Sequence, residues 1–80
     1  MSNMYIRLNT IQDVRNFVNV VTSADNDIDL TSGRYVVDAK SIMGIFSLDL
    51  MNPILLTIQG EAAPALLEAL KPFVVDAPEK

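Results

Sequence analysis

The 80-residue chain contains no cysteine and no histidine, and these two absences exclude several kinds of active site. Without cysteine the chain has no disulfide and no thiolate chemistry, which fits a protein of the reducing cytosol. Without histidine there is no Ser-His-Asp catalysis, no imidazole ligand for a metal ion and no phosphohistidine.

Positive charge is also scarce, since six Lys and Arg stand against ten Asp and Glu and the net charge is −4. The basic residues form no cluster, so the sequence predicts no binding to nucleic acid. No apolar run approaches the roughly 20 residues that cross a bilayer. The stretch MSNMYIRLNT lacks the apolar core of a signal peptide. We therefore expect a cytoplasmic protein that does not enter a membrane.

Half of the residues are apolar and one fifth are charged, which is the composition of a globular domain. The pattern predicts the order β-α-β-β-α-β-α. Alternation with a period of two indicates strands at 4–8, 27–30 and 34–39, and the more fully apolar run at 54–60 indicates a central strand. Short helices are expected at 41–48 and 61–70.

Helical spacing predicts one longer amphipathic helix after the first strand. Its apolar stripe consists of Ile11, Val14, Phe17, Val18 and Val21. Asn9 or Thr10 is expected to cap this helix, because Thr10-x-x-Asp13 is a weaker relative of the capping box. The last helix is expected to bury Leu66, Leu67, Leu70 and Phe73. Helices on one face of an antiparallel sheet make a two-layer α+β domain whose opposite sheet face meets water.

Asp25, Asp27 and Asp29 have the spacing of ligands in a calcium loop. The loop pattern then fails, because Leu30 stands where glycine is required and Val36 where a bidentate glutamate is required. Strand alternation explains the acidic residues more simply. The sequence therefore predicts no metal site and no cofactor.

Residues 38–48 read DAKSIMGIFSL. This stretch and the order of elements resemble the phosphocarrier protein HPr of the bacterial sugar phosphotransferase system, whose members commonly carry Lys-Ser-Ile-Met-Gly after the third strand. The match continues upstream through NDIDLTSGRYVVDAKSIMG and covers nearly the whole chain. The resemblance implies that residues 1–80 form a single HPr-like domain. That fold is an open-faced β-sandwich, with a four-stranded antiparallel sheet and three helices on one face.

The resemblance implies two sites, of which the first is a phosphorylated histidine at the start of the first helix, in the motif Gly-Ile-His-Ala-Arg-Pro. Ungapped counting from Ser41 places Thr10 at the histidine position and Gln12 at the arginine position. A threonine hydroxyl forms a stable phosphate ester, and the loss of arginine removes a bidentate phosphate clamp. The resemblance thus implies that Thr10 and Gln12 are a degenerate carrier site, and we expect a non-enzymatic chain without phosphohistidine carrier activity.

The second site is Ser41, which matches the serine that a dedicated kinase phosphorylates in many Gram-positive members of the family. Ile42, Met43 and Phe46 match the apolar docking positions of the family, whereas helical spacing assigns Ile45 and Leu48 to the core. The resemblance thus implies a regulatory, protein-binding module with HPr kinase or a catabolite regulator as partner. Ser41 would be its phosphorylation switch.

Three alternatives stay open at this point. Ser41 is also a preferred helix N-cap, and that role alone explains its presence. The chain could instead be a phosphotransferase-system component with an atypical phosphoryl acceptor. It could also be a structural homodimeric module in which the apolar patch packs against a second copy, so both a monomer and a weak homodimer are compatible with the sequence.

Overall fold

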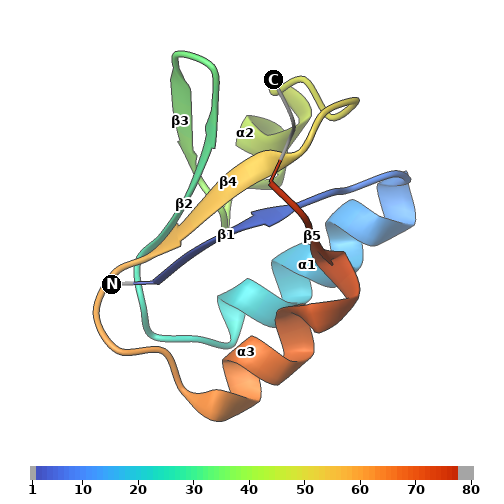
Figure 1. The fold of residues 1–80 in the computed structure, drawn as a ribbon. Helices are drawn as coiled ribbons and strands as arrows, with labels where there is room; N and C mark the ends of the chain where they lie inside the picture. The colour runs from blue at the N-terminus through green and yellow to red at the C-terminus, as the bar shows by residue number, and fades with distance from the viewer. Residues whose placement is uncertain (1, 78–80) are drawn as a thin grey trace.

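A computed structural model describes residues 2–77 and places all helices on one face of a single antiparallel sheet (Figure 1). The strand order is β3-β2-β4-β1-β5. The strands are β1 (Ser2–Ile6), β2 (Ile28–Ser32), β3 (Tyr35–Asp38), β4 (Ile54–Ile58) and β5 (Val74–Val75). The helices are α1 (Ile11–Thr22), α2 (Ile42–Phe46) and α3 (Pro64–Leu70), followed by the 3-10 turn η1 (Lys71–Phe73).

The sheet register separates a buried face from an open one. In the centre of the sheet, Leu56 of β4 lies opposite Met4 of β1 and Leu30 of β2. One residue away, Leu55 lies opposite Tyr5 and Thr31. Because side chains alternate along a strand, the first row points to the helices and the second row points to the uncovered face. The two-layer α+β prediction is confirmed.

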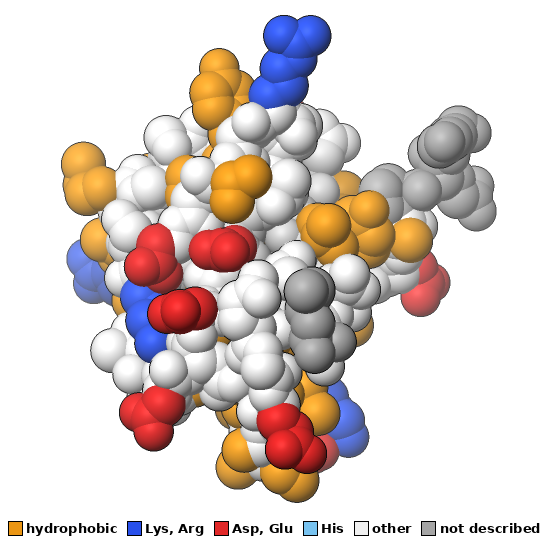
Figure 2. Space-filling view, turned by 90° about the vertical axis from the view of Figure 1, so that its left-hand side faces the viewer, with side chains coloured by type: hydrophobic (Ala, Val, Ile, Leu, Met, Phe, Trp, Pro, Cys, Tyr) orange, Lys and Arg blue, Asp and Glu red, His pale blue; other side chains and the backbone are white. Residues whose placement is uncertain are grey.

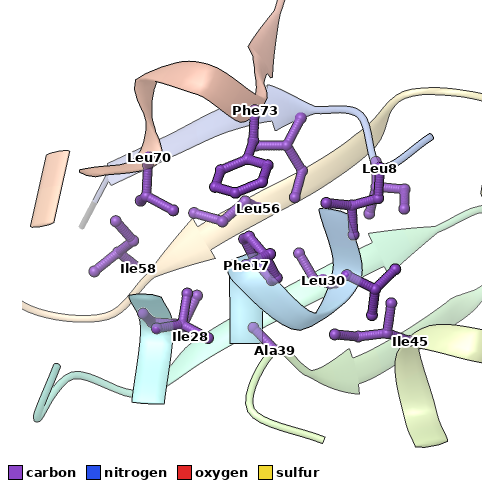
Figure 3. Packing of buried hydrophobic residues seen from close by; sticks show 14 of the residues in the cluster. Leu8, Phe17, Ile28, Leu30, Ala39, Ile45, Leu56, Ile58, Leu70 and Phe73 are labelled. Atoms are coloured by element: carbon purple, nitrogen blue, oxygen red, sulfur yellow. The ribbon is translucent and has the colours of Figure 1, made fainter. Parts of the chain in front are cut away.

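The core fills the space between the sheet and α1, with Phe17 near its centre (Figure 3). The rings of Phe17 and Phe73 meet edge to face, with 5.6 Å between their centroids. α1 contacts α2 on one side and α3 on the other. The buried residues are Ile6, Leu8, Val14, Phe17, Val21, Ile28, Leu30, Ala39, Ile45, Leu48, Ile54, Leu56, Ile58, Leu66, Leu70 and Phe73. None of the helices within residues 2–77 has the length and apolar content needed to span a membrane.

The predicted four-stranded sheet is a small error, because the described residues form five strands. The fifth, β5, contributes two residues that pair with Tyr5 and Ile6. It follows η1 directly, and two residues are too few to show a period-two pattern. The bounds of the elements also differ from the predicted ones. β1 and β2 are shifted by one or two residues, and α3 begins at Pro64 instead of residue 61. The hairpin turn between β2 and β3 consists of Gly33 and Arg34.

Two residues predicted in apolar stripes are exposed. Ile11 is the first residue of α1, and helical side chains tilt toward the helix N-terminus, so its side chain extends past the covered part of the helix. Leu67 is 38% exposed, whereas Leu66 and Leu70 are buried. Residues 66 and 70 share one face of a helix, and residue 67 is turned about 100° away from residue 66.

Candidate functional site

Thr10 lies at the N-terminus of α1 and caps it. Its side-chain oxygen accepts a hydrogen bond from the backbone N–H of Asp13 at 3.0 Å. In return, Asp13 Oδ2 accepts from the backbone N–H of Asn9 at 3.0 Å. These two bonds satisfy N–H groups that a helix start leaves free, so the predicted relative of the capping box is confirmed. The Thr10 hydroxyl, which the sequence predicts at the carrier position, therefore has a structural role.

Gln12 follows Thr10 by two residues, but its side chain points along the helix. Gln12 Nε2 donates to Asn16 Oδ1 at 2.9 Å, one turn further on. A carboxamide held in this way carries no positive charge and offers no fork of donors toward Thr10. The arrangement does not reproduce the arginine clamp of a phosphate site.

The segment before α2 is fixed by main-chain and side-chain hydrogen bonds. Asp38 Oδ1 accepts from the backbone N–H of Lys40 at 2.9 Å, and its carbonyl oxygen accepts from the N–H of Ser41 at 3.0 Å. The Lys40 ammonium donates to the carbonyl of Ala24 at 2.8 Å. These bonds connect the end of β3 to the loop after α1 and set the position at which α2 begins.

Ser41 is exposed and is the N-cap of α2, as expected. Its Oγ accepts from the N–H of Gly44 at 3.2 Å, and its carbonyl accepts from the N–H of Ile45 at 3.0 Å. A Cβ added at Gly44 would lie 3.2 Å from Val37 Cβ and 3.3 Å from Ser41 Oγ. The glycine thus lets α2 approach β3 closely and keeps the serine oxygen uncrowded.

The two sides of α2 divide as helical spacing predicts. Ile45 and Leu48 are buried, whereas Ile42, Met43 and Phe46 are 36%, 77% and 43% exposed. We call the last three the α2 patch. Their predicted exposure is confirmed, and their role in binding a partner stays a prediction.

A hollow of about 280 Å³ lies between the start of α1 and the end of α2. It is lined by Arg7, Leu8, Asn9, Thr10, Ile11, Phe46, Leu50 and Met51. Thr10 and Phe46, which the sequence assigned to two separate sites, therefore border the same hollow. Gln12, Ser41 and the other two residues of the α2 patch do not line it. The predicted carrier position, Thr10, and the α2 patch therefore meet at this hollow, where the patch contributes Phe46.

Two exposed apolar residues at this hollow were not predicted as functional. Ile11 is 64% exposed and Met51 is 77% exposed. Ile11 fits the apolar stripe of α1, so its spacing pointed to the core. Met51 lies in the loop between α2 and β4, where no periodicity marks it. The one sequence feature that could have indicated the exposure of Ile11 is its position directly after the helix N-cap.

The acidic residues of the calcium-like pattern do not converge. Asp27 and Asp29 border one hollow with Asp38 and Lys40, whereas Asp25 borders a different one. Figure 2 shows carboxylate side chains gathered near basic ones on the side of the molecule that carries the β2–β3 hairpin. Within residues 2–77, no group of three or more acidic side chains is arranged to hold a metal ion.

Comparison with known proteins identifies the family. A family model described as the PTS HPr component phosphorylation site, where PTS is the phosphotransferase system, matches residues 13–76. The chain belongs to the HPr family. The matched range begins three residues after Thr10, so it includes Ser41 and the α2 patch but neither Thr10 nor Gln12. No curated protein sequence matches.

Solved HPr structures are similar over nearly the whole chain. HPr-C-His from Thermoanaerobacter tengcongensis is 25% identical with a TM-score of 0.77, covering 92% of this chain and 91% of that one. The phosphocarrier protein HPr from Bacillus anthracis str. Ames is 30% identical with a TM-score of 0.69, covering 92% and 94%. The HPr-like fold is confirmed, and the chain is a member of the phosphocarrier family of the PTS.

Proposed function

We propose that this HPr-family protein is a cytoplasmic, non-enzymatic regulatory module that binds partner proteins and does not carry phosphoryl groups as phosphohistidine. The observation that carries the proposal is the absence of histidine from the sequence. Thr10, at the carrier position, uses its hydroxyl oxygen as a helix cap. The chain keeps the fold of the family without the nitrogen nucleophile of its carrier reaction.

The surroundings of Thr10 support this reading. A threonine hydroxyl is a weak nucleophile unless an adjacent base activates it. Asp13 is the nearest carboxylate in the cap, and its Oδ2 accepts from the backbone N–H of Asn9. A threonine ester, if formed, would lack the transfer potential of a phosphoimidazole. Thr10 is therefore a structural residue, and an atypical acceptor at this position is the weaker alternative.

Partner binding is proposed for the α2 patch together with Ile11 and Met51. These five apolar residues are exposed, and three of them, Ile11, Phe46 and Met51, line the hollow between α1 and α2. Exposed apolar side chains gathered in this way are common at protein-binding surfaces. Arg7 adds one positive charge to the rim. HPr kinase or a catabolite regulator is the proposed partner.

Ser41 is the proposed switch of this surface. Its oxygen is exposed at the start of α2 and is in contact with the N–H of Gly44. A phosphate there would gain hydrogen bonds from free N–H groups at the helix start. It would place negative charge directly before Ile42 and Met43. Partner affinity would then change while the core stays as it is, because Ser41 contributes nothing to the buried cluster.

The test is incubation with HPr kinase and ATP, followed by intact-mass measurement. The expected result is the addition of one phosphoryl group, which Ser41→Ala abolishes. Ser47→Ala is the matched control, since Ser47 is exposed at the other end of the same helix. It should be modified like the parent chain. An unmodified parent chain would leave Ser41 as a helix cap only.

A further inference from the structure

The outer edge of β3 is an uncovered strand edge in the described part of the chain. β3 ends the strand order, and its pairing partner is β2. The N–H of Ala39 donates to the carbonyl of Ile28 at 2.9 Å. Antiparallel strands bond through alternate residues, so odd-numbered residues of this strand face β2. The N–H and C=O groups of Val36 therefore point away from the sheet.

The side chains around this edge are also exposed. Tyr35 and Val36 are 71% and 62% exposed. α2 does not cover the edge, because the close approach of Gly44 is to Val37, on the helix side of the sheet. Figure 1 shows the β2–β3 hairpin standing out from the remainder of the sheet. Strand edges are usually protected by proline, lysine or a bulge, and the register of Tyr35–Asp38 with β2 runs without a bulge.

The turn residue Arg34 and the strand β3 together read Arg-Tyr-Val-Val-Asp at 34–38, which is self-complementary. If two copies pair antiparallel about a two-fold axis at Val36, each Arg34 lies opposite Asp38 of the other copy. The two Val36 residues lie opposite each other, and Tyr35 lies opposite Val37. Val36 and Asp38 share one face of β3, and Arg34 directly precedes the strand in the hairpin turn. In this pairing, two Arg34–Asp38 ion pairs would flank the apolar contact between the Val36 residues.

We propose that β3 is a homodimerisation edge, through which two copies join their sheets into one continuous antiparallel sheet. The hydrogen bonds between the two copies begin with the outward N–H and C=O groups of the two Val36 residues. A second copy is the occupant because the charges are symmetric about Val36. The net charge of −4 on each chain otherwise disfavours association. The hollow between α1 and α2 contains no residue of β3, so both copies keep it open.

Sedimentation equilibrium and NMR diffusion measurements test the association itself. The range from about 10 μM to about 1 mM is suited to an interface smaller than those of stable complexes. The average mass should rise with concentration from that of one chain toward that of two. A single-chain mass throughout this range would overturn the proposal.

Charge reversal tests the register. Arg34→Asp places two carboxylates opposite each other, and Asp38→Arg places two guanidinium groups opposite each other. Each should weaken self-association at least about tenfold, because like charges directly opposite destabilise paired strands. An equimolar mixture should form a heterodimer, since opposite charges then meet at both positions. Failure of the mixture to associate would contradict the proposed register.

Asp38 also accepts a hydrogen bond from the N–H of Lys40, so a backbone variant provides an independent test. Val36→Pro removes an outward N–H and leaves the bonds to β2 in place, which an edge strand tolerates. Val36→Thr is the matched control, because it keeps that N–H. Val36→Pro should remain monomeric, while Val36→Thr should still dimerise. A dimer that persists in Val36→Pro would assign the contact to another surface.

Discussion

Replacing Thr10 with alanine removes one defined interaction from the proposed degenerate carrier site. The substitution deletes the oxygen that accepts from the backbone N–H of Asp13 at 3.0 Å. It keeps the reciprocal bond from the N–H of Asn9 to the Asp13 carboxylate. Thr10 is exposed, so no cavity is created. The cost is therefore that of one N-cap bond, about 1 kcal/mol of the free energy of unfolding.

A loss of this size is measurable in a domain of this length. A change of about 1 kcal/mol lowers the melting temperature by roughly 4–8 °C in domains of about 60–100 residues. Chemical denaturation followed by circular dichroism should give a lower midpoint with an unchanged m-value. Thr10→Ser, which keeps the oxygen, should have a stability close to that of the parent chain.

Thr22→Ala is the matched control, because Thr22 is an exposed threonine at the last position of the same helix. It should change stability by less than about 0.5 kcal/mol. Equal effects of Thr10→Ala and Thr22→Ala would refute the capping role of Thr10. The Thr10 hydroxyl would then have no demonstrated structural role.

Three further predictions concern the core, the hairpin and the α2 patch. Phe17→Ala should cost about 3–5 kcal/mol in denaturant unfolding, because Phe17 is fully buried and packs on Phe73; a cost below 1 kcal/mol would contradict the described core. Gly33→Ala should cost about 1–2 kcal/mol, since Gly33 has a φ of 59° and an added Cβ meets no atom within 4 Å, so the cost is backbone strain alone; unchanged stability would contradict this turn. Met43→Asp should weaken binding to HPr kinase at least about tenfold, while the free energy of unfolding stays within about 0.5 kcal/mol of the parent value. The control Leu67→Asp, on α3, should leave binding unchanged. Equal binding by both variants would place the docking surface elsewhere.

The helix starts were predictable because their determinants are local. Thr10 and Ser41 each directly precede an isoleucine, and each accepts a hydrogen bond from an N–H three residues later. The split of α2 was also predictable, since residues 45 and 48 share a face. Periodicity indicates the buried face of an element wherever the element is long enough to repeat its pattern.

The wrong predictions of burial and strand number arise where the periodicity of a segment does not show which other elements pack against it. Ile11 has the spacing of a core residue but lies at the first position of its helix, where nothing covers it. Leu66 and Leu67 are equally apolar, and the packing of α3 against α1 and the core decides which one is buried. β5 depends on η1 bringing Val74 beside β1, a contact between distant parts of the chain.

The hollow between α1 and α2 shows the same limitation for the functional site. Thr10 and Phe46 are 36 positions apart in the sequence. No pattern within either segment indicates that both border one hollow with Met51. The resemblance to HPr supplied the two sites separately, and the packing of α1 against α2 brings them together.

Phosphoryl transfer from phosphoenolpyruvate, catalysed by the first enzyme of the phosphotransferase system, most directly tests whether this chain has lost the carrier reaction. The phosphocarrier protein HPr from Bacillus anthracis is the positive control in the same assay. Labelled phosphoenolpyruvate should leave acid-labile label on the control protein and none on this chain. Acid-labile label on this chain, at a level comparable to the control, would contradict the proposal and establish an atypical phosphoryl acceptor.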